Sequence, residues 1–534
     1  MSGEPAGSRP KIFLREATGL VREISWKSVF IYVMTVMGFQ FTFYYIASLA
    51  PLIGGNLAFG FLIYAIASTV SILVYYAFIS IMPRSGGDYV FNSRTLNPII
   101  GFIGNISLGI ILLLFAAING VTIETTALST LFAYLGVTYN NPGLVQLAST
   151  ISQPVWIITL GLIWIIGSSI FALRSTRFYL KVQNYMFVIV MIGALSMIVA
   201  LILTPHVGFV NAFNIFVGKY LNKPNNYYSN VISDASSIGW SLPASSVAAG
   251  LLIYPLLAVG AIWGGTSAQV GGEIRNPKRS YLLGTLAGSF LYIGLTAVTL
   301  LLTYHTVGFR FMSAIDYLLY NDPSKVPLPA LPYVDMLISI ATNPILAIII
   351  IMAGFLQLII YIPSAYIFMS RGLFAYSFDG VLPRFFGKVS DRTHGPVNSV
   401  IASTVIAVLL FAVINIPASA TYAYLFGSVA TWWTAIFPTF FVGLSATLLS
   451  RLKPALHRYA PIKGVKLGVL GILVMVFMGI LVFLMLTNSV YGANTPIGIG
   501  LMMGLLVALI VVYAVSWARK GSALKLAFQE IPPE

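Results

Sequence analysis

The sequence predicts an all-α polytopic membrane protein, and three of its features support this prediction. Hydrophobic residues make up 58% of the 534 residues and charged residues only 8%, whereas a soluble domain carries about 25% charged residues. About twelve apolar stretches are long enough to cross a bilayer as α-helices, which takes roughly 20 residues each. Lys and Arg residues gather in alternate connections between these stretches.

The apolar stretches divide the chain into membrane spans and polar connections. Their approximate limits are 28–50, 57–81, 98–132, 154–173, 180–203, 247–271, 281–304, 343–370, 397–415, 421–449, 466–487 and 495–517. The third and eighth are longer than a perpendicular crossing requires, so we expect them to tilt strongly or to project beyond the membrane. The expected organisation is a cytoplasmic N-terminal segment (1–27), a ten-helix transport core (28–449), two additional membrane helices (450–518) and a cytoplasmic tail (519–534).

The basic residues predict the orientation of the chain in the membrane. All but four of the 29 Lys and Arg residues lie in the N-terminal segment, in the even-to-odd connections or in the C-terminal tail. The four exceptions are Lys219, Lys223, Arg310 and Lys325. Because short cytoplasmic loops retain the excess of Lys and Arg, we expect a plasma-membrane protein with both termini in the cytoplasm. This distribution also accounts for the net charge of +15 without a nucleic-acid partner.

Signatures of catalysis and of cofactor binding are absent from the sequence. The chain has no cysteine, which excludes disulfides, Cys-ligated zinc and thiol catalysis. It has no Gly-rich loop followed by GK[ST], no HExxH and no GxSxG. Nothing therefore indicates a nucleotide-phosphate site, a metalloprotease-type zinc site or a hydrolase nucleophile. We expect neither an enzyme nor a cofactor or metal site.

Glycines interrupt the sixth span. The stretch LLIYPLLAVGAIWGGTSAQVGGEIRNPKRS, residues 251–280, begins as an apolar helix and then contains Gly260, Gly264 and Gly265. A helix broken at membrane depth leaves backbone N–H and C=O groups unpaired, and such a break persists only inside protein or around a polar cavity. Close packing of a neighbouring helix is the alternative explanation of these glycines. Three glycines within six residues favour a break over close packing.

A second break is expected in the first span, at Gly38, directly before Phe39 and Gln40. The first and sixth spans are five helices apart. Interrupted helices at matching positions in the two halves of a transporter indicate its transport site. The pairing predicts an inverted repeat in which helices 1–5 correspond to helices 6–10, with helices 11 and 12 appended.

The two breaks also indicate the kind of solute. A helix N-terminus carries about half a positive charge and a C-terminus about half a negative charge, so two broken helices offer donors for a carboxylate and carbonyls for an ammonium group. Neither break contains Lys, Arg, Asp or Glu, which favours a net-neutral zwitterion. Apolar walls suited to an aliphatic or aromatic side chain would come from Met34, Met37, Phe39 and Trp263.

Ionisable residues within the spans are rare and by default suggest function. Glu124 lies about 25 residues beyond the start of the third span, which at about 1.5 Å per residue places it near the outer surface. We interpret it as a vestibule or capping carboxylate, with a buried proton carrier as the alternative. Glu273 and Asp335 lie close to helix ends. Uncharged polar candidates, each of which could equally bond between helices, are Gln40, Asn105, Asn119, Gln269 and Gln357.

Three stretches resemble the amino acid–polyamine–organocation (APC) superfamily of permeases. The first is PRSGGDYVFNSRTLNPIIGFIGN at 83–105, and the second is GGEIRNPKR at 271–279. The third, SRGLFAYSFDGVLPRFFGKVS from 370 with a following Gly-Pro-Val-Asn, is the most specific of the three. Its residues in register with the superfamily pattern are Ser370, Arg371, Asp379, Gly380, Leu382, Pro383 and Pro396.

The resemblance implies a LeuT-like 5+5 inverted repeat with alternating access around a site between helices 1, 3, 6 and 8. Such permeases mostly move amino acids or polyamines by proton symport or by exchange. The substrate-binding residues carried over by position are Met37, Gly38, Phe39 and Gln40 in helix 1 and Ala261, Ile262, Trp263, Gly264 and Gly265 in helix 6, to which we add Gln357. The gating or coupling candidates are Glu124, Glu273, Arg371 and Asp379.

The chain departs from the superfamily pattern where coupling and substrate binding are usually set. The Gly-Ser-Gly run of helix 1 is MGFQF here, and Gly265 stands where an acidic residue is usual in helix 6. Val190 stands at the helix 5 position where some proton-coupled members carry Lys. Ser364 has no neighbouring Ser or Thr near the sodium position of helix 8. The mode of coupling therefore stays open.

The leading hypothesis is a secondary active permease that couples uptake or exchange of a small neutral amino acid to H⁺. A polyamine or nucleobase transporter on the same fold is the close alternative. A permease-like sensor that binds without transport, or a channel, is the alternative from a different class. The expected partners are the amino acid, H⁺ and the lipid bilayer, and the sequence predicts no oligomeric state.

Overall fold

The computed structural model describes residues 20, 22–38, 46–54, 57–244, 246–417, 435–488, 491 and 493–529, without the side chains of 248, 259–264, 435–436, 522–527 and 529. Every regular element in these residues is a helix, and two isolated β-bridges join Ile24 to Ile274 and Ser85 to Val270. The fold class predicted from the sequence, an all-α polytopic membrane protein, is confirmed.

Nine helices in the described residues are long and apolar enough to cross a membrane. They are α4 (Leu57–Ile81), α6 with η3 and α7 (Pro98–Thr138), α9 (Pro154–Arg174), α10 (Thr176–Leu203), α15 with η6 and α16 (Pro277–Asn321), α18 (Pro344–Phe378), α19 (Val397–Asn415), α23 (Val465–Thr487) and the first part of α24 (Pro496–Gln529). Three shorter apolar helices are α1 (Trp26–Met37), the 249–258 part of α13 (Val247–Leu251) and α14 (Ile253–Gly264), and the 437–452 part of η9 (Ala435–Phe440) and α21 (Phe441–Leu452). Each of the twelve predicted spans overlaps one of these twelve helices.

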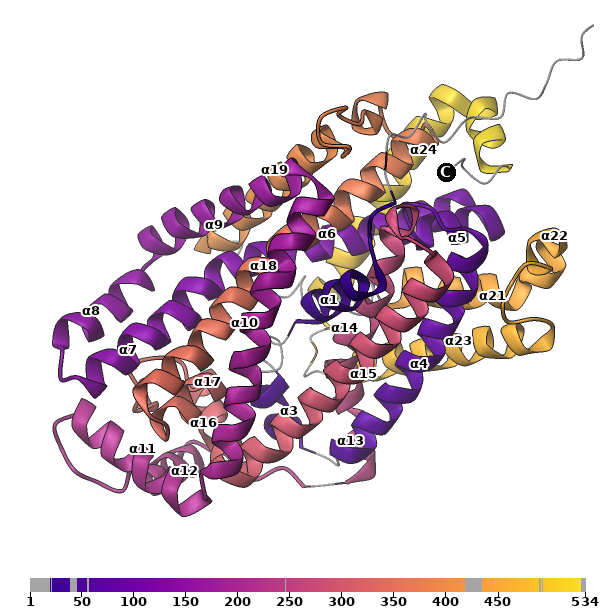
Figure 1. The fold of residues 1–534 in the computed structure, drawn as a ribbon. Coiled ribbons are helices and arrows are strands. Elements are labelled where there is room, and N and C mark those ends of the chain that lie inside the picture. The colour runs from indigo at the N-terminus through magenta and orange to yellow at the C-terminus, as the bar shows by residue number, and fades with distance from the viewer. Residues whose placement is uncertain are drawn as a thin grey trace, which may run out of the picture.

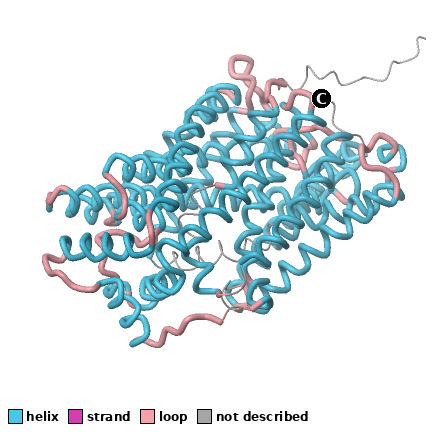
Figure 2. Tube along the Cα trace, turned by 60° about the horizontal axis from the view of Figure 1, so that its bottom comes forward, coloured by secondary structure: helices cyan, strands magenta, loops and turns pink. Residues whose placement is uncertain are grey.

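The long helices form one bundle, and short helices gather at its two ends (Figures 1 and 2). At one end, lower left in Figure 1, lie α8 (Pro142–Ile151), α11 (His206–Tyr220) and α12 (Tyr227–Ser237). At the other end, upper right, lie α5 (Asp88–Thr95) and α22 (Pro454–His457). The remaining short elements are α3 (Ala47–Ile53), η4 (Gly265–Gln269), η5 (Gly271–Glu273), η7 (Pro323–Lys325), α17 (Val334–Ile340) and η8 (Arg384–Gly387).

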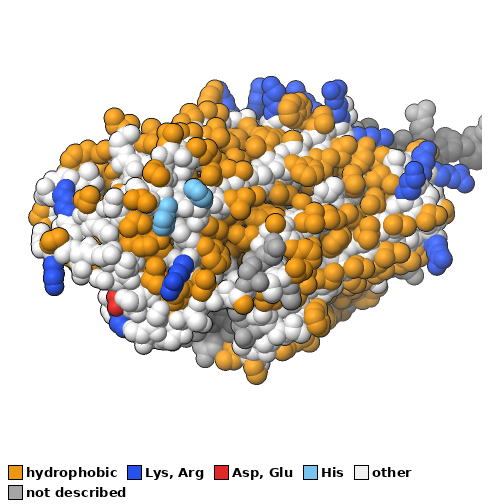
Figure 3. All heavy atoms as spheres, turned by 90° about the horizontal axis from the view of Figure 1, so that it is seen from below, with side chains coloured by type: hydrophobic (Ala, Val, Ile, Leu, Met, Phe, Trp, Pro, Cys, Tyr) orange, Lys and Arg blue, Asp and Glu red, His pale blue; other side chains and the backbone are white. Residues whose placement is uncertain are grey.

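The flanks of the bundle expose apolar side chains, as a surface in contact with lipid requires. Ile163, Ile166 and Ile170 of α9 are each more than half exposed, and α10 exposes Val188 and Ile192 in the same way. Figure 3 shows one face of the molecule covered largely by hydrophobic side chains, with most of its Lys and Arg side chains at the edges. The bundle is therefore built to lie in a bilayer.

Glycines on α15 allow α1 to approach closely. A Cβ atom added at Gly284 would lie 2.7 Å from the carbonyl oxygen of Trp26, and one at Gly288 would lie 3.1 Å from the carbonyl oxygen of Phe30. The two glycines are four residues apart and so occupy the same face of α15. This small-xxx-small spacing is the usual means by which membrane helices bring their backbones into contact.

Both predicted helix breaks lie where an α-helix ends. Helix α1 ends at Met37, and Gly38 follows with φ +69°, a conformation that favours glycine. Helix α14 continues through Gly260 to Gly264, and a 3₁₀ segment, η4, takes over at Gly265. The sequence prediction that Gly260 also interrupts the helix is wrong, because a glycine inside a helix keeps its backbone hydrogen bonds and loses only some stability.

Candidate functional site

The end of α1 and the middle of α18 come together through one side chain. Gln357 of α18 is fully buried, and its Nε2 donates a hydrogen bond of 3.0 Å to the carbonyl oxygen of Thr35. Among the described residues the Gln357 Oε1 atom has no hydrogen-bond partner. Met34 and Met37 are also buried in this last turn of α1. A buried amide oxygen without a partner beside a helix end is a suitable acceptor for a polar solute.

The second predicted break lies beside α4. A Cβ atom at Gly265 would lie 3.1–3.3 Å from the Tyr75 ring, so only glycine fits here without displacing that ring. Ala261, Ile262, Trp263 and Gly264 form the last turn of α14, but their side chains lie outside the described residues, as do Phe39 and Gln40 altogether. Of the predicted substrate-binding residues, the structure therefore describes Met37, Gly38, Gly265 and Gln357 in full.

From its distance along the helix we predicted that Glu124 is a vestibule or capping carboxylate near the outer surface, but the structure does not place it in an exposed position. It lies in the π-helical turn η3 (Ile123–Leu128), and its side chain is fully buried. The indole Nε1 of Trp164 on α9 donates a hydrogen bond of 2.7 Å to its Oε1 atom. The prediction failed because α9 covers this face of the helix, and no feature of the Glu124 segment alone reveals that cover.

A buried ion pair joins the segment after η4 to α18. The Nε atom of Arg371 lies 2.8 Å from Glu273 Oε1, and its Nη2 atom lies 3.1 Å from Oε2. Both side chains are at most 4% exposed. The hydroxyl of Thr176, at the start of α10, donates a hydrogen bond of 2.8 Å to Glu273 Oε2 and accepts one from Arg371. Three elements are thereby held together at one point.

The N-terminal segment is attached to the same point. The backbone N–H groups of Glu23 and Ile24 both donate to the carbonyl oxygen of Glu273, each at 2.9 Å. The N–H of Arg275 donates in turn to the carbonyl oxygen of Ile24 at 2.9 Å. Asn276, in the left-handed conformation with φ +46°, then turns the chain into α15, whose first residue is Pro277. Proline at this position lacks an N–H that would be unpaired in any case.

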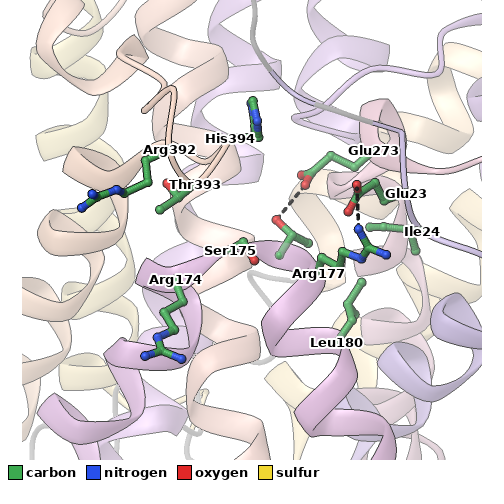
Figure 4. A pocket seen from close by; sticks show the side chains of 11 residues that line it. Glu23, Ile24, Arg174, Ser175, Arg177, Leu180, Glu273, Arg392, Thr393 and His394 are labelled. Atoms are coloured by element: carbon green, nitrogen blue, oxygen red, sulfur yellow. Dashed lines mark hydrogen bonds and ion pairs between the residues drawn. The ribbon is translucent and has the colours of Figure 1, made fainter.

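Two neighbouring cavities share part of their walls at this point. The larger, of about 220 Å³, lies between Glu23, Thr176, Arg177, Glu273 and His394, among others. Glu273 accepts the hydrogen bond from Thr176 in the wall of this cavity, and Figure 4 shows Arg177 directed toward Glu23. The smaller, of about 10 Å³, is lined by Tyr32, Tyr179, Ser267 and Ile367. Both share Ile24, Thr176 and Leu180 in their walls, so they follow one route between α1, α10, η4 and α18.

A second buried ion pair joins α5 to the end of α18. Arg94 donates two hydrogen bonds to the Asp379 carboxylate, at 2.6 Å and 2.7 Å. The hydroxyl of Tyr89 donates a third at 2.6 Å. Asp379 is the C-cap of α18, and Gly380 follows with φ +82°. The N–H of Val381 donates to the carbonyl oxygen of Tyr376 at 2.8 Å, which completes a Schellman cap.

The glycine pair of the first family-like stretch positions α5 against η4. Gly86 and Gly87 have φ +103° and +46°, and a Cβ atom at Gly87 would lie 3.0 Å from the backbone of Ala268. The N–H of Gly86 donates to the carbonyl oxygen of Gln269 at 3.0 Å. Only glycine satisfies both the conformation and the close approach. The chain then enters α5 at Asp88.

Both partners of the Arg371–Glu273 pair are predicted site residues, whereas in the Arg94–Asp379 pair only Asp379 is one. Arg371, Glu273 and Asp379 were predicted from motifs, and the structure gives each a partner. Thr176 and Tyr89 were missed, because a lone hydroxyl carries no sequence signal. Asn105 and Gln269, which we predicted as interhelical hydrogen-bonding groups among other interpretations, bond to one another, as do Asn119 and the carbonyl oxygen of Leu358 at 3.3 Å.

Comparison with known proteins identifies one family. A family model described as amino acid permease matches residues 24–518, which is nearly the whole chain. The match begins just before α1 and ends within α24, so it includes both helix ends and both ion pairs described above. No curated protein matches the chain.

Proposed function

The chain belongs to the amino acid permease family and is a transporter of the APC type, and we propose that it works by alternating access as a secondary active carrier of a small neutral amino acid. Residues 28–449 form its transport core, an inverted repeat of five and five helices, and residues 450–518 add two helices. We place it in the plasma membrane with both termini in the cytoplasm, because nearly all Lys and Arg residues lie on that side.

The observation that carries this proposal is the position of the two helix ends. Helix α1 ends at Met37 and α14 ends at Gly264, and the two helices are in contact. The last turn of each helix leaves backbone carbonyl groups free, which accept hydrogen bonds without a fixed charge. The Gln357 amide oxygen, buried and without a partner among the described residues, lies beside the first of these ends. These acceptors suit the ammonium group of a neutral amino acid.

The two buried ion pairs support the proposed alternation of access. Glu273 and Asp379 both lie at the proposed cytoplasmic end, and their partners Arg371 and Arg94 come from other elements. The pairs therefore act as the cytoplasmic gate, and the route through Ile24, Thr176 and Leu180 is the path that opens when the Glu273 pair separates. The mechanism needs only relative movement of these elements and no chemical step.

Counterflow in proteoliposomes tests the proposal. Vesicles loaded with an unlabelled solute should accumulate the same labelled solute transiently, and we expect this for one or a few neutral amino acids. Polyamines and nucleobases form the comparison panel, and counterflow with those alone would replace the proposed substrate class. Ligand-induced thermal stabilisation without any counterflow would instead identify a sensor, since binding raises stability by mass action whether or not transport follows.

A further inference from the structure

A buried carboxyl at the start of α5 has a free oxygen. Asp88 is 4% exposed, and its Oδ1 atom accepts a hydrogen bond of 2.9 Å from Asn105 Nδ2. Its Oδ2 atom has no hydrogen-bond partner in the part of the chain that the structure describes. Among the described residues no ion pair reaches it, since Arg94 on the same helix is bonded to Asp379. A charged carboxylate held by one neutral donor in a dry site is poorly stabilised.

The groups around Asp88 are neutral hydroxyls and amides. Tyr75 of α4, Tyr281 of α15 and Tyr376 of α18 are its titratable electrostatic neighbours. A phenol stays neutral near pH 7, so none of the three supplies a compensating charge. Burial raises the pKa of Asp88 to about 7, although the Asn105 amide opposes the shift by stabilising the charged form.

The amides next to Asp88 join helices that must move relative to one another in an alternating-access carrier. Asn105 belongs to α6, and its Nδ2 donates both to Asp88 and to Gln269 Oε1, each at 2.9 Å. Gln269 ends η4, directly after the interrupted helix, and its Nε2 donates to Asn105 Oδ1 at 3.2 Å and to the carbonyl oxygen of Phe368 on α18 at 3.3 Å. Tyr376 completes the network by donating to Asn105 Oδ1.

We propose that Asp88 is the proton-coupling carboxyl of this transporter, and that the Asn105–Gln269 pair links its protonation to the movement of the segment after α14. This inference rests on the proposed transport function. With the network closed, water is excluded and Asp88 holds a proton on Oδ2, taken from the extracellular solution while the transport site faces outward. When η4 moves and the site opens inward, the hydrogen bonds between Gln269 and Asn105 break, water reaches the carboxyl and the proton dissociates to the cytoplasm. The proton transfers to and from water are the only covalent changes.

The position also answers a difficulty raised by the sequence. Val190 stands where some proton-coupled relatives carry a lysine in helix 5, and its apolar side chain is 1% exposed in α10. A chain that couples to protons therefore needs its titratable group elsewhere. Asp88 is linked to the moving segment through the Asn105 amide and lies outside the long apolar helices.

The Asp88→Asn variant separates coupling from transport. Asparagine has the shape of the protonated acid and cannot release a proton, so counterflow of the substrate should stay within a few-fold of the wild-type rate. Accumulation driven by an inwardly directed proton gradient should fall from concentrative to equilibrium level. The control is Asp335→Asn, which neutralises an equally buried aspartate in α17. It should leave gradient-driven accumulation unchanged.

Each possible result of these measurements either supports or contradicts the inference about Asp88. Concentrative, gradient-driven uptake by Asp88→Asn would overturn the inference, and so would a wild-type protein that performs counterflow but never responds to a proton gradient. A wild-type protein without counterflow of any solute would instead refute the proposed function. If Asp88→Asn fails to fold, Asn105→Ala decides. Loss of a donor to the charged carboxylate should raise its pKa and move the alkaline limb of the uptake profile up by about one pH unit. An unshifted limb would contradict the inference.

Discussion

At the scale of single residues, the Arg371–Glu273 pair has the properties expected of a gate, which must be stable when closed and must separate to open. The guanidinium bonds to both carboxylate oxygens, and Thr176 joins them from a third element. Removing one partner leaves a buried charge without compensation, which typically costs about 3–5 kcal/mol. The neighbouring pair Arg177–Glu23, at 3.8 Å and largely exposed, is of the kind that contributes about 0–1 kcal/mol.

Cysteine accessibility can measure this gate, because the natural chain contains no cysteine. Leu180→Cys places one thiol in the wall shared by both cavities, where the native side chain is 7% exposed. Adding Glu273→Gln should weaken the pair and increase the rate of labelling by a water-soluble maleimide several-fold. Glu23→Gln in the same background is the matched control and should leave the rate unchanged. Equal rates in all three proteins would argue against a gate at Glu273.

Asp335 predicts a pH dependence of stability. This aspartate, in the first turn of α17, is fully buried, and burial raises its pKa to about 7 from an ordinary value of 3.8. Between these two values the folded protein binds a proton that the unfolded chain does not, so the free energy of unfolding falls as pH rises from about 4 to about 7. Asp335→Asn should therefore raise the melting temperature at pH 8 and change it little at pH 4.

Melting curves of the purified protein in detergent, recorded from pH 4 to pH 8, test this prediction. Asp322→Asn is the comparison, because it removes the same charge from a surface residue whose pKa is lowered by a hydrogen bond from Ser324. It should give no stabilisation at alkaline pH. A constant difference between wild type and Asp335→Asn across the whole range would indicate a packing effect in place of a titration.

At the scale of elements, hydropathy predicted where helices occur better than where they end. Nine of the twelve predicted spans correspond to helices of the described residues that are long and apolar enough to cross a membrane, and the other three overlap shorter apolar helices. Hydropathy locates such helices because hydrocarbon allows few alternatives to an apolar helix of about 20 residues. The seventh was predicted to end at 304, but its helix continues to Asn321. Asp316 in that extension is fully buried. A hydropathy profile does not distinguish a buried carboxylate in a helix from a charged residue in a loop, so it predicts an early helix end.

The candidate site was predictable only in part for a related reason. A motif fixes the local geometry of its own segment, as the Asp379–Gly380 helix cap illustrates. It does not name a partner that is far along the chain. Arg94 lies 285 residues from Asp379 in sequence, and Thr176 lies 97 residues from Glu273. Those contacts depend on the packing of whole helices, which neither composition nor periodicity encodes in a form that can be read from one sequence.

The glycine face of α15 gives a prediction at this scale. Gly284→Leu should separate α1 from α15, since even a Cβ atom there would lie 2.7 Å from the backbone of Trp26 and from Val29. We expect a strong loss of folded protein in size-exclusion profiles of detergent extracts. Gly294→Leu on the same helix is the matched control, because no atom lies within 4 Å of an added Cβ. Similar losses in both variants would mean that helix propensity, and not contact with α1, sets the effect.

At the scale of the whole molecule, the two ion pairs and the Asp88 network lie at the same end of the bundle. In the proposed transport cycle the ion pairs form the gate and the Asp88 network couples transport to protons. Each connects elements far apart in sequence to α18, the 35-residue helix that carries Gln357, Phe368, Arg371 and Tyr376 along its length. In the proposed cycle, α18 is the element against which α1 and η4 move. The opposite end has few basic residues. Which of the two ends faces the cytoplasm determines whether the ion pairs form an internal or an external gate.

That orientation can be tested with two single cysteines. Lys223→Cys lies between α11 and α12 at the end poor in basic residues, and Lys463→Cys lies between α22 and α23 at the basic end; both native side chains are exposed. Because Lys and Arg are retained in the cytoplasm, an impermeant maleimide should label Lys223→Cys in intact cells and label Lys463→Cys only after permeabilisation. Neither substitution removes enough positive charge to reverse the bias. The reverse pattern would invert the membrane orientation, place the Glu273 and Asp379 pairs outside the cell and make them an external gate.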